Sequence, residues 1–188
     1  MRKIISSQHV SLDGFVAGPK GEMDWIKLDE ELFDLVGTFT SKADTALYGR
    51  VTWEMMDSYW PAAGDRPGAS KHDLEHSRWY NAVDKLVLSK SMRGKKADKT
   101  KFISDNVFSE INSFKQAPGK NVLIFGSPTA CHSLMEHNLI DEYWLFVNPV
   151  VLGQGIPLFA NVKTRVNLKP LDTKSFSCGV TALHYSTE

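Results

Sequence analysis

Short runs of apolar residues, each about the length of one β-strand, alternate along the chain with segments of helical spacing. The clearest run is Asn121-Val122-Leu123-Ile124-Phe125, which leads into Gly126-Ser127-Pro128-Thr129. A continuous apolar run of this length is typical of a strand buried on both faces. Pro128 suits the first turn of a helix, which we expect over residues 129–138. The alternation predicts an α/β fold with a mixed, mostly parallel central sheet flanked by helices.

Further elements follow from the same patterns. We expect strands at residues 3–10, 45–48 and 85–89, and helices at residues 28–39, 52–57, 71–80 and 107–114. Turn-forming or lysine-rich stretches predict loops at 11–21, 60–70 and 90–101. The last third predicts successive strands at 142–152, 165–171 and 175–185, and therefore an antiparallel C-terminal edge. No stretch resembles a linker, so residues 1–188 are expected to form a single domain.

Composition excludes several classes of function. The chain has 22 basic and 22 acidic residues, so no overall field attracts nucleic acid or an anionic membrane. No apolar run approaches the roughly 20 residues needed to cross a bilayer, and the N-terminus lacks the apolar core of a secretory signal. Cys131 and Cys178 are too few for a disulfide scaffold. These features predict a cytoplasmic protein.

Three strand ends carry residue types that suit phosphate groups. Gly49, Arg50 and Thr52 join a buried strand to a helix start, Ser89 and Lys90 end a second strand, and Gly126-Ser127 ends a third. Uncapped N–H groups, hydroxyls and a guanidinium together favour an anion. Because parallel strands end at one edge of a sheet, the three segments together favour a dinucleotide site. The glycine motifs of ordinary Rossmann and P-loop proteins are absent.

The segment Gly49-Arg50-Val51-Thr52-Trp53-Glu54 resembles the corresponding strand–helix junction of dihydrofolate reductases, and Phe125-Gly126-Ser127 resembles their glycine turn. The segments at residues 11–18, 139–142 and 149–159 are more similar to the reductase domain of the bifunctional riboflavin-biosynthesis deaminase-reductase and its stand-alone relatives. The resemblance covers nearly the whole chain in order. No zinc-deaminase pattern accompanies it.

The resemblance implies an NADPH-dependent reductase with a dihydrofolate-reductase-like fold. The implied cofactor-binding residues lie by the nicotinamide (Ala17, Gly18), at the phosphates (Gly49, Arg50, Thr52, Ser89, Lys90) and at the pyrophosphate turn (Gly126, Ser127, Thr129, Ala130). Hydride would pass to a small heterocyclic substrate, with Trp25 and Trp53 as expected substrate contacts. The implied substrate is 5-amino-6-(5-phosphoribosylamino)uracil of riboflavin biosynthesis, and the implied assembly is a homodimer.

The sequence differs from dihydrofolate reductases at two places, and these differences leave the chemistry open. Ser127 stands where dihydrofolate reductases carry a second glycine. Their single carboxylate on the first helix has four counterparts here, Asp29, Glu30, Glu31 and Asp34, and of these we favour Glu31. Asp13 and Glu31 are therefore the candidate catalytic residues. The alternatives are a pterin reductase of the dihydrofolate type and a nucleotide-binding module without catalysis.

Two further patterns have simpler interpretations. His72-Asp73-Leu74-Glu75-His76 matches the five-letter pattern of some zinc peptidases, but no third ligand is evident, so we expect an exposed polar helix and no metal. The aromatic residues Trp53, Tyr59, Trp60, Trp79 and Tyr80 favour core or interface packing over a wall for a flat ligand.

Overall fold

A computed structural model describes residues 1–160, 162–163 and 165–188. The chain forms two compact units. The first comprises residues 1–2 and 30–123, and the second comprises residues 3–29 and 124–188. Each unit combines segments that are distant in sequence, and each is described by itself below. Whether the chain folds as the expected single domain stays a prediction.

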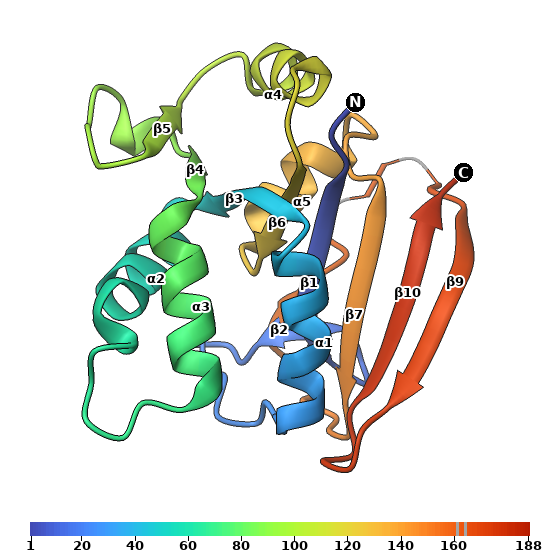
Figure 1. Cartoon of the computed structure of the whole chain (residues 1–188). Helices are drawn as coiled ribbons and strands as arrows, with labels where there is room; N and C mark the ends of the chain where they lie inside the picture. Colours follow the sequence, from blue (N-terminus) through green and yellow to red (C-terminus); the bar gives the residue numbers. More distant parts are fainter. Residues whose placement is uncertain (161, 164) are drawn as a thin grey trace. The chain divides into compact units, whose positions relative to one another are not determined.

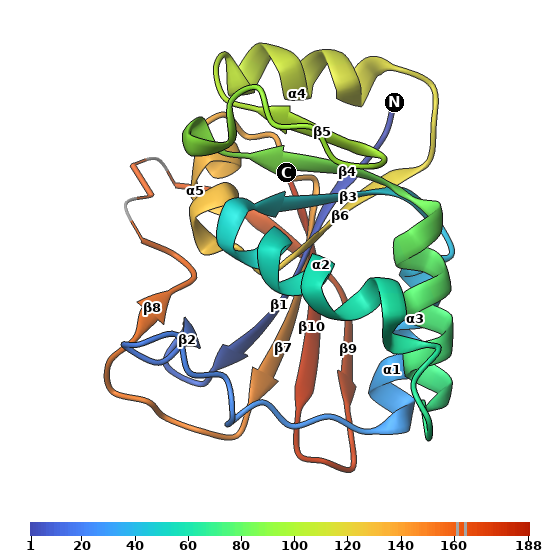
Figure 2. The ribbon, with the colours of Figure 1, turned by 90° about the vertical axis from the view of Figure 1, so that its left-hand side faces the viewer.

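Parallel strands form the sheet of the first unit. They are β3 (Ala43–Gly49), β4 (Asp84–Leu88) and β5 (Thr100–Ile103), and Figure 2 shows them one beside the next. In the strand order β3 has β6 (Asn121–Phe125) on its other side. Ala46, Leu47 and Tyr48 are fully buried, as their apolar run predicts. The sequence analysis missed β5 because it begins within the lysine-rich stretch that we expected to be an exposed connection.

Four α-helices belong to the first unit: α1 (Glu30–Thr40), α2 (Arg50–Ala63), α3 (Lys71–Ala82) and α4 (Val107–Gln116). A 3-10 turn, η1 (Lys90–Met92), follows β4. The buried residues of α1 include Leu32, Val36 and Phe39, which have the spacing of one helix face. The predicted helix at 52–57 was too short, since α2 continues through Pro61. Pro61 cannot donate to the carbonyl of the preceding turn, and α2 ends two residues later, at Ala63.

The strands of the second unit change from parallel to antiparallel. In the strand order β6 is followed by β1 (Ile4–Ser11), β7 (Glu142–Asn148), β10 (Thr181–Thr187) and β9 (Leu168–Ser175). β1 is parallel to β7, whereas β10 is antiparallel to both β7 and β9 (Figure 1). A two-stranded sheet, β2 (Phe15–Ala17) with β8 (Ile156–Pro157), and helix α5 (Pro128–Met135) complete this unit. The expected α/β fold with an antiparallel C-terminal edge is confirmed.

The boundaries of the last strands differ from those expected. β7 ends at Asn148 because Pro149, the next residue, has no N–H to donate to a ladder. β10 begins only at Thr181, since residues 176–180 form a tight turn in which Phe176 N donates to Val180 O at 2.9 Å. β2 also lies inside the stretch that we expected to be a loop. No helix among the described residues is long and apolar enough to cross a membrane.

Candidate functional site

The carboxyl ends of three parallel strands meet in one row of the first unit. Gly49 pairs with Leu88, and Leu88 pairs with Ile103. The chain continues from these residues into Arg50, Ser89 and Ser104. Ser89 N donates to Ile103 O at 3.0 Å, and Ser104 Oγ donates to Ser89 O at 3.0 Å. The register therefore places predicted phosphate-binding residues side by side at one edge of this sheet.

Helix α2 starts at this edge without a side-chain cap. Gly49 is its N-cap residue, so the first N–H groups of the helix receive no side-chain hydrogen bond from it. Thr52 is partly buried in the first turn. Arg50 is half-exposed, and its Nη1 lies 2.7 Å from Glu54 Oε2 one turn along the helix. This ion pair keeps the Arg50 guanidinium near the start of the helix. A bound anion would compete with Glu54 for the guanidinium.

The second strand end adds a hydroxyl and a cation. Ser89 Oγ lies 3.1 Å from Ser91 Oγ. The Lys90 residue is exposed, and no ion pair to it occurs among the described residues. Its neighbour Arg93 differs, because Arg93 Nη2 lies 2.6 Å from Asp105 Oδ2. Arg50 and Lys90 are thus the cations that the row of strand ends offers to a phosphate.

Trp53, the expected substrate contact of this unit, packs edge-on against Phe102 with ring centroids 5.2 Å apart. Its Nε1 atom is buried and has no hydrogen-bond partner among the described residues. Glu31 is exposed in the first turn of α1. Of the other acids that we considered with it, Asp34 forms a 2.6 Å ion pair with Lys71. Glu31 as the catalytic acid stays a prediction.

In the second unit, the chain enters α5 through two consecutive left-handed residues. Gly126 has φ 72° and Ser127 has φ 64°. Ser127 therefore has the left-handed backbone that favours glycine, and its side chain makes no capping hydrogen bond. Gln8 Nε2 lies 3.3 Å from Gly126 O, which ties the turn to β1. Thr129 is exposed and Ala130 is buried in the first turn of the helix.

Asp13 links two loops of the second unit. Its carboxylate accepts hydrogen bonds from Ser11 Oγ at 2.7 Å, Gly153 N at 2.7 Å and Leu152 N at 3.1 Å. The hydrogen bond from Ser11, followed by those from the two backbone amides, lowers the pKa of Asp13. A carboxylate held ionised in this way can orient the loop, but it has little tendency to carry a proton.

The expected nicotinamide residues follow on β2. Ala17 and Gly18 are both buried. A β-carbon on Gly155 would collide with the carbonyl oxygen of Ala17, so Gly155 permits the close approach of β8 to β2. Gly18 N donates to Glu22 O at 2.8 Å, and Trp25 Nε1 donates to the same oxygen at 3.1 Å. The loop that carries Trp25 thus begins from a closed turn.

Sequence analysis overlooked a pair of polar residues at the ends of β1 and β7. Asn148 is fully buried, and its Oδ1 accepts from Lys27 N at 2.8 Å. Its Nδ2 donates to Phe146 O at 3.0 Å and lies 3.3 Å from Nδ1 of His9. A lone histidine inside an otherwise buried strand was the available signal. The pair brings β1, β7 and the segment after Trp25 together.

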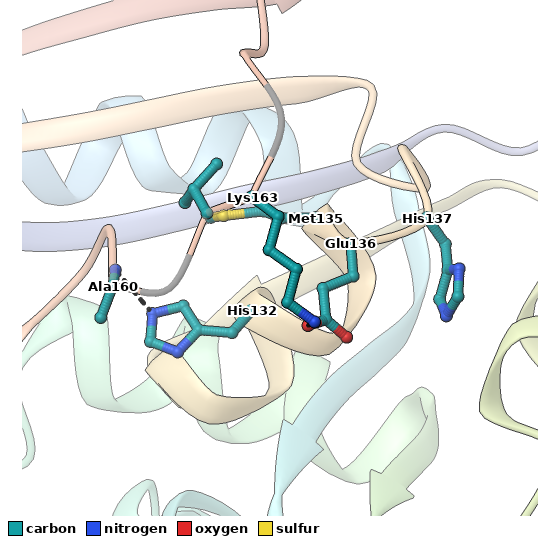
Figure 3. A pocket seen from close by; sticks show the side chains of 7 residues that line it. His132, Met135, Glu136, His137, Ala160 and Lys163 are labelled. Atoms are coloured by element: carbon teal, nitrogen blue, oxygen red, sulfur yellow. Dashed lines mark hydrogen bonds and ion pairs between the residues drawn. The ribbon is translucent and has the colours of Figure 1, made fainter.

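A hollow of about 260 Å³ lies beside the second half of α5 (Figure 3). The His132 ring faces Ala160, whereas the Lys163 amine lies 3.4 Å from Glu136 Oε1 and His137 points away from both. His132 Nε2 lies 2.6 Å from Leu158 O and 3.4 Å from Ala160 N. The hollow is at the opposite end of α5 from Gly126 and Ser127, and none of the expected site residues lines it.

The histidines of the five-letter pattern belong to an aromatic cluster in the first unit. His76 is buried, with its ring 4.1 Å from Trp60 and 5.1 Å from Trp79. His72 stacks on Phe33 at 3.8 Å. Burial, followed by the charge of His72, lowers the pKa of His76 to about 3. The helix is therefore less exposed than expected, and no group of three potential metal ligands occurs in the described part of the chain.

This fold is that of the dihydrofolate-reductase-like α/β proteins. A dihydrofolate reductase from Enterococcus faecalis, solved in complex with NADP(H) and RAB-propyl, has a TM-score of 0.64 with 16% identity, over 99% of this chain and 96% of that one. A protein from Shewanella sp. PV-4, whose given name refers to riboflavin biosynthesis, reaches 0.72 with 22% identity, over 100% and 99% of the two chains. At such identities the likeness establishes the fold alone.

The chain belongs to the RibD C-terminal domain family, whose model matches residues 2–182. The uncharacterized protein YyaP of Bacillus subtilis strain 168 is 37% identical, over 98% of this chain and 94% of YyaP. The deaminase/5-amino-6-(5-phosphoribosylamino)uracil reductase of Thermotoga maritima has a TM-score of 0.68 with 15% identity, and the alignment covers all of this chain but 57% of that one. At 15% identity the T. maritima protein likewise shows the fold alone.

Proposed function

We propose that this protein is an NADPH-dependent reductase that transfers hydride to a small heterocycle related to 5-amino-6-(5-phosphoribosylamino)uracil. The row of strand ends in the first unit supports the proposal most directly. Uncapped N–H groups of α2, the hydroxyl of Ser89 and the cations Arg50 and Lys90 are all donors, which is what a nucleotide phosphate requires.

The second unit carries two features that suit parts of a dinucleotide. The Gly126-Ser127 turn opens α5 with free N–H groups, which suits a pyrophosphate. The buried Ala17 and Gly18 offer a water-poor backbone surface for the nicotinamide. The bound cofactor would supply the hydride, while residues of this chain bind and orient the reactants. The T. maritima neighbour's name supports a pyrimidine as substrate.

Calorimetric titration with NADPH and with NADH tests the cofactor assignment. Arg50→Ala should weaken NADPH binding about tenfold to a hundredfold, the usual range for a charge-assisted phosphate contact. Arg93→Ala is the matched control, because Arg93 forms a similar exposed ion pair, with Asp105, but is not among the predicted phosphate contacts. Glu54→Gln should not weaken binding, since it releases Arg50 from its intrahelical partner. Equal affinity of wild type and Arg50→Ala would contradict this use of Arg50.

Lys90 is proposed to distinguish NADPH from NADH. Lys90→Ala should therefore reduce NADPH affinity and leave NADH affinity unchanged. Oxidation of NADPH with 5-amino-6-(5-phosphoribosylamino)uracil, and separately with dihydrofolate, then tests the substrate. Binding without turnover of either would favour the nucleotide-binding module. A homodimer in the cytoplasm remains part of the proposal, and sedimentation of the purified protein tests the dimer.

A further inference from the structure

His9 differs from the other two partly buried histidines of its unit, His132 and His184, in what its Nε2 atom contacts. The Nε2 atoms of His132 and His184 lie 2.6 Å from Leu158 O and 2.9 Å from Glu142 Oε2. Asn148 is the one hydrogen-bond partner of the His9 side chain among the described residues, and it faces Nδ1. The His9 ring is partly buried, and its Nε2 atom has no hydrogen-bond partner among the described residues.

The contacts of Asn148 decide which nitrogen of His9 carries the proton. The N–H of Lys27 can only donate, so the Asn148 atom that it meets at 2.8 Å must be the carbonyl oxygen. The amide NH₂ group then faces both Phe146 O and His9 Nδ1. Because an amide NH₂ can only donate, Nδ1 must be unprotonated. His9 is a neutral imidazole that holds its proton on Nε2.

Packing fixes the ring in this orientation. His9 stacks on Phe146 with ring centroids 5.0 Å apart and an interplanar angle of 23°. Burial lowers the pKa of His9 to about 4, which agrees with a neutral ring at ordinary pH. His9 lies two residues before Ser11, where β1 ends and the loop to Ala17 and Gly18 begins. The free N–H is therefore at the carboxyl end of β1, where ligands of such sheets bind.

We propose that His9 Nε2–H donates a hydrogen bond to the ring of the bound substrate, at a carbonyl oxygen or an unprotonated ring nitrogen. This assignment rests on the proposed reductase function. A neutral donor suits an uncharged acceptor, whereas a phosphate would favour the imidazolium form that Asn148 opposes. His9 thus recognises the heterocycle rather than its phosphate and selects substrates that carry an acceptor at that position.

A pair of near-isosteric substitutions separates the two ring nitrogens. The amide nitrogen of glutamine falls near the position of Nε2, and that of asparagine falls near Nδ1. His9→Asn should lower kcat/KM for 5-amino-6-(5-phosphoribosylamino)uracil about tenfold or more, as expected for the loss of one substrate hydrogen bond. His9→Gln should keep most of the wild-type kcat/KM. NADPH affinity should stay unchanged in both variants, and equal loss of kcat/KM in both would overturn the assignment.

His184→Gln is the matched control, since His184 is also stacked and partly buried, but its Nε2 already has a partner in Glu142. It should leave kcat/KM unchanged. Wild-type protein labelled with ¹⁵N-histidine and saturated with NADP⁺ provides a readout that does not depend on how the variants fold. Adding the pyrimidine should shift the Nε2–H resonance of His9 and slow its exchange, while Nδ1 stays unprotonated. An unchanged resonance would overturn the assignment.

The cofactor titration distinguishes the two possible failures. Absence of NADPH binding would remove the reductase function and the His9 assignment with it. NADPH binding together with an unperturbed His9 would leave the reductase function standing and overturn the assignment alone.

Discussion

Ser127 carries a left-handed backbone with φ 64°, which costs a residue with a β-carbon roughly 1 kcal/mol or more. Ser127→Gly should therefore raise the free energy of unfolding by about 0.5–1 kcal/mol, even though glycine gains entropy in the unfolded chain. Urea denaturation at neutral pH measures the change. Ser133→Gly, within α5, is the control and should lower stability by a similar amount. If Ser127→Gly instead lowers the free energy of unfolding, the serine side chain stabilises the fold by more than its left-handed backbone costs.

Asp13 accepts hydrogen bonds from the backbone N–H groups of Leu152 and Gly153 and so holds them to the loop after β1. Its folded pKa is depressed, so its contribution is present above the unfolded pKa and is lost as the pH falls through the folded value. Asp13→Asn should speed hydrogen exchange at the amides of Leu152 and Gly153 at neutral pH. Asp172→Asn, on edge strand β9, should not. Unchanged exchange in Asp13→Asn would refute the link between the loops.

At the scale of the element, α3 depends on its first residues. Ser70 Oγ accepts from Asp73 N at 3.1 Å, and Asp73 Oδ2 accepts from Ser70 N at 2.9 Å, which together form a capping box. Ser70→Ala should lower the free energy of unfolding by about 1 kcal/mol. Ser58→Ala is the comparison, because the Ser58 hydroxyl only bonds back to Met55 O within α2. Equal effects of the two substitutions would show that the cap does not stabilise α3.

At the scale of the whole molecule, Glu142 on β7 joins the two ends of the chain. Its carboxylate oxygens lie 2.6 Å from Lys3 Nζ and 2.9 Å from His184 Nε2. Burial by itself would raise the pKa of Glu142, but the hydrogen bonds from Lys3 and His184 outweigh it and hold the pKa below its usual range. The stabilisation is therefore complete above the unfolded pKa, about 4.3, and is lost as the pH falls through the lower folded value.

Glu142→Gln should lower the free energy of unfolding by about 1–2 kcal/mol at pH 7, since it weakens a largely buried, charge-assisted pair. The difference from wild type should shrink below about pH 4, where the wild-type carboxylate is itself protonated. Urea denaturation from pH 7 to pH 3 follows both proteins. Asp34→Asn breaks the exposed pair with Lys71 and should have almost no effect. A difference that stays constant with pH would refute the role of the charge.

The sequence by itself determined the fold class and most of its elements. A continuous apolar run such as Val122-Leu123-Ile124 indicates a strand buried on both faces, and these residues are buried. The spacing of Leu32, Val36 and Phe39 places them on one face of a helix. Gly49-Arg50 and Gly126-Ser127 were identified because a strand, a flexible turn and a helix start are adjacent in the chain. The order of residues is sufficient to predict these strand–turn–helix junctions, because the residues that form each junction are adjacent in the chain.

Only the tertiary structure decided how residues distant in sequence are used. β5 depends on pairing with β4, which its own lysine-rich surroundings do not indicate. Asp13 is a loop anchor because residues 152 and 153 fold back onto it. His9 acquired a defined tautomer from Asn148, and Asn148 was itself oriented by Lys27. The roles of Asp13, His9 and Asn148 arise from hydrogen bonds between segments more than 100 residues apart. Hydrogen bonding depends on direction and distance, which the order of residues does not contain.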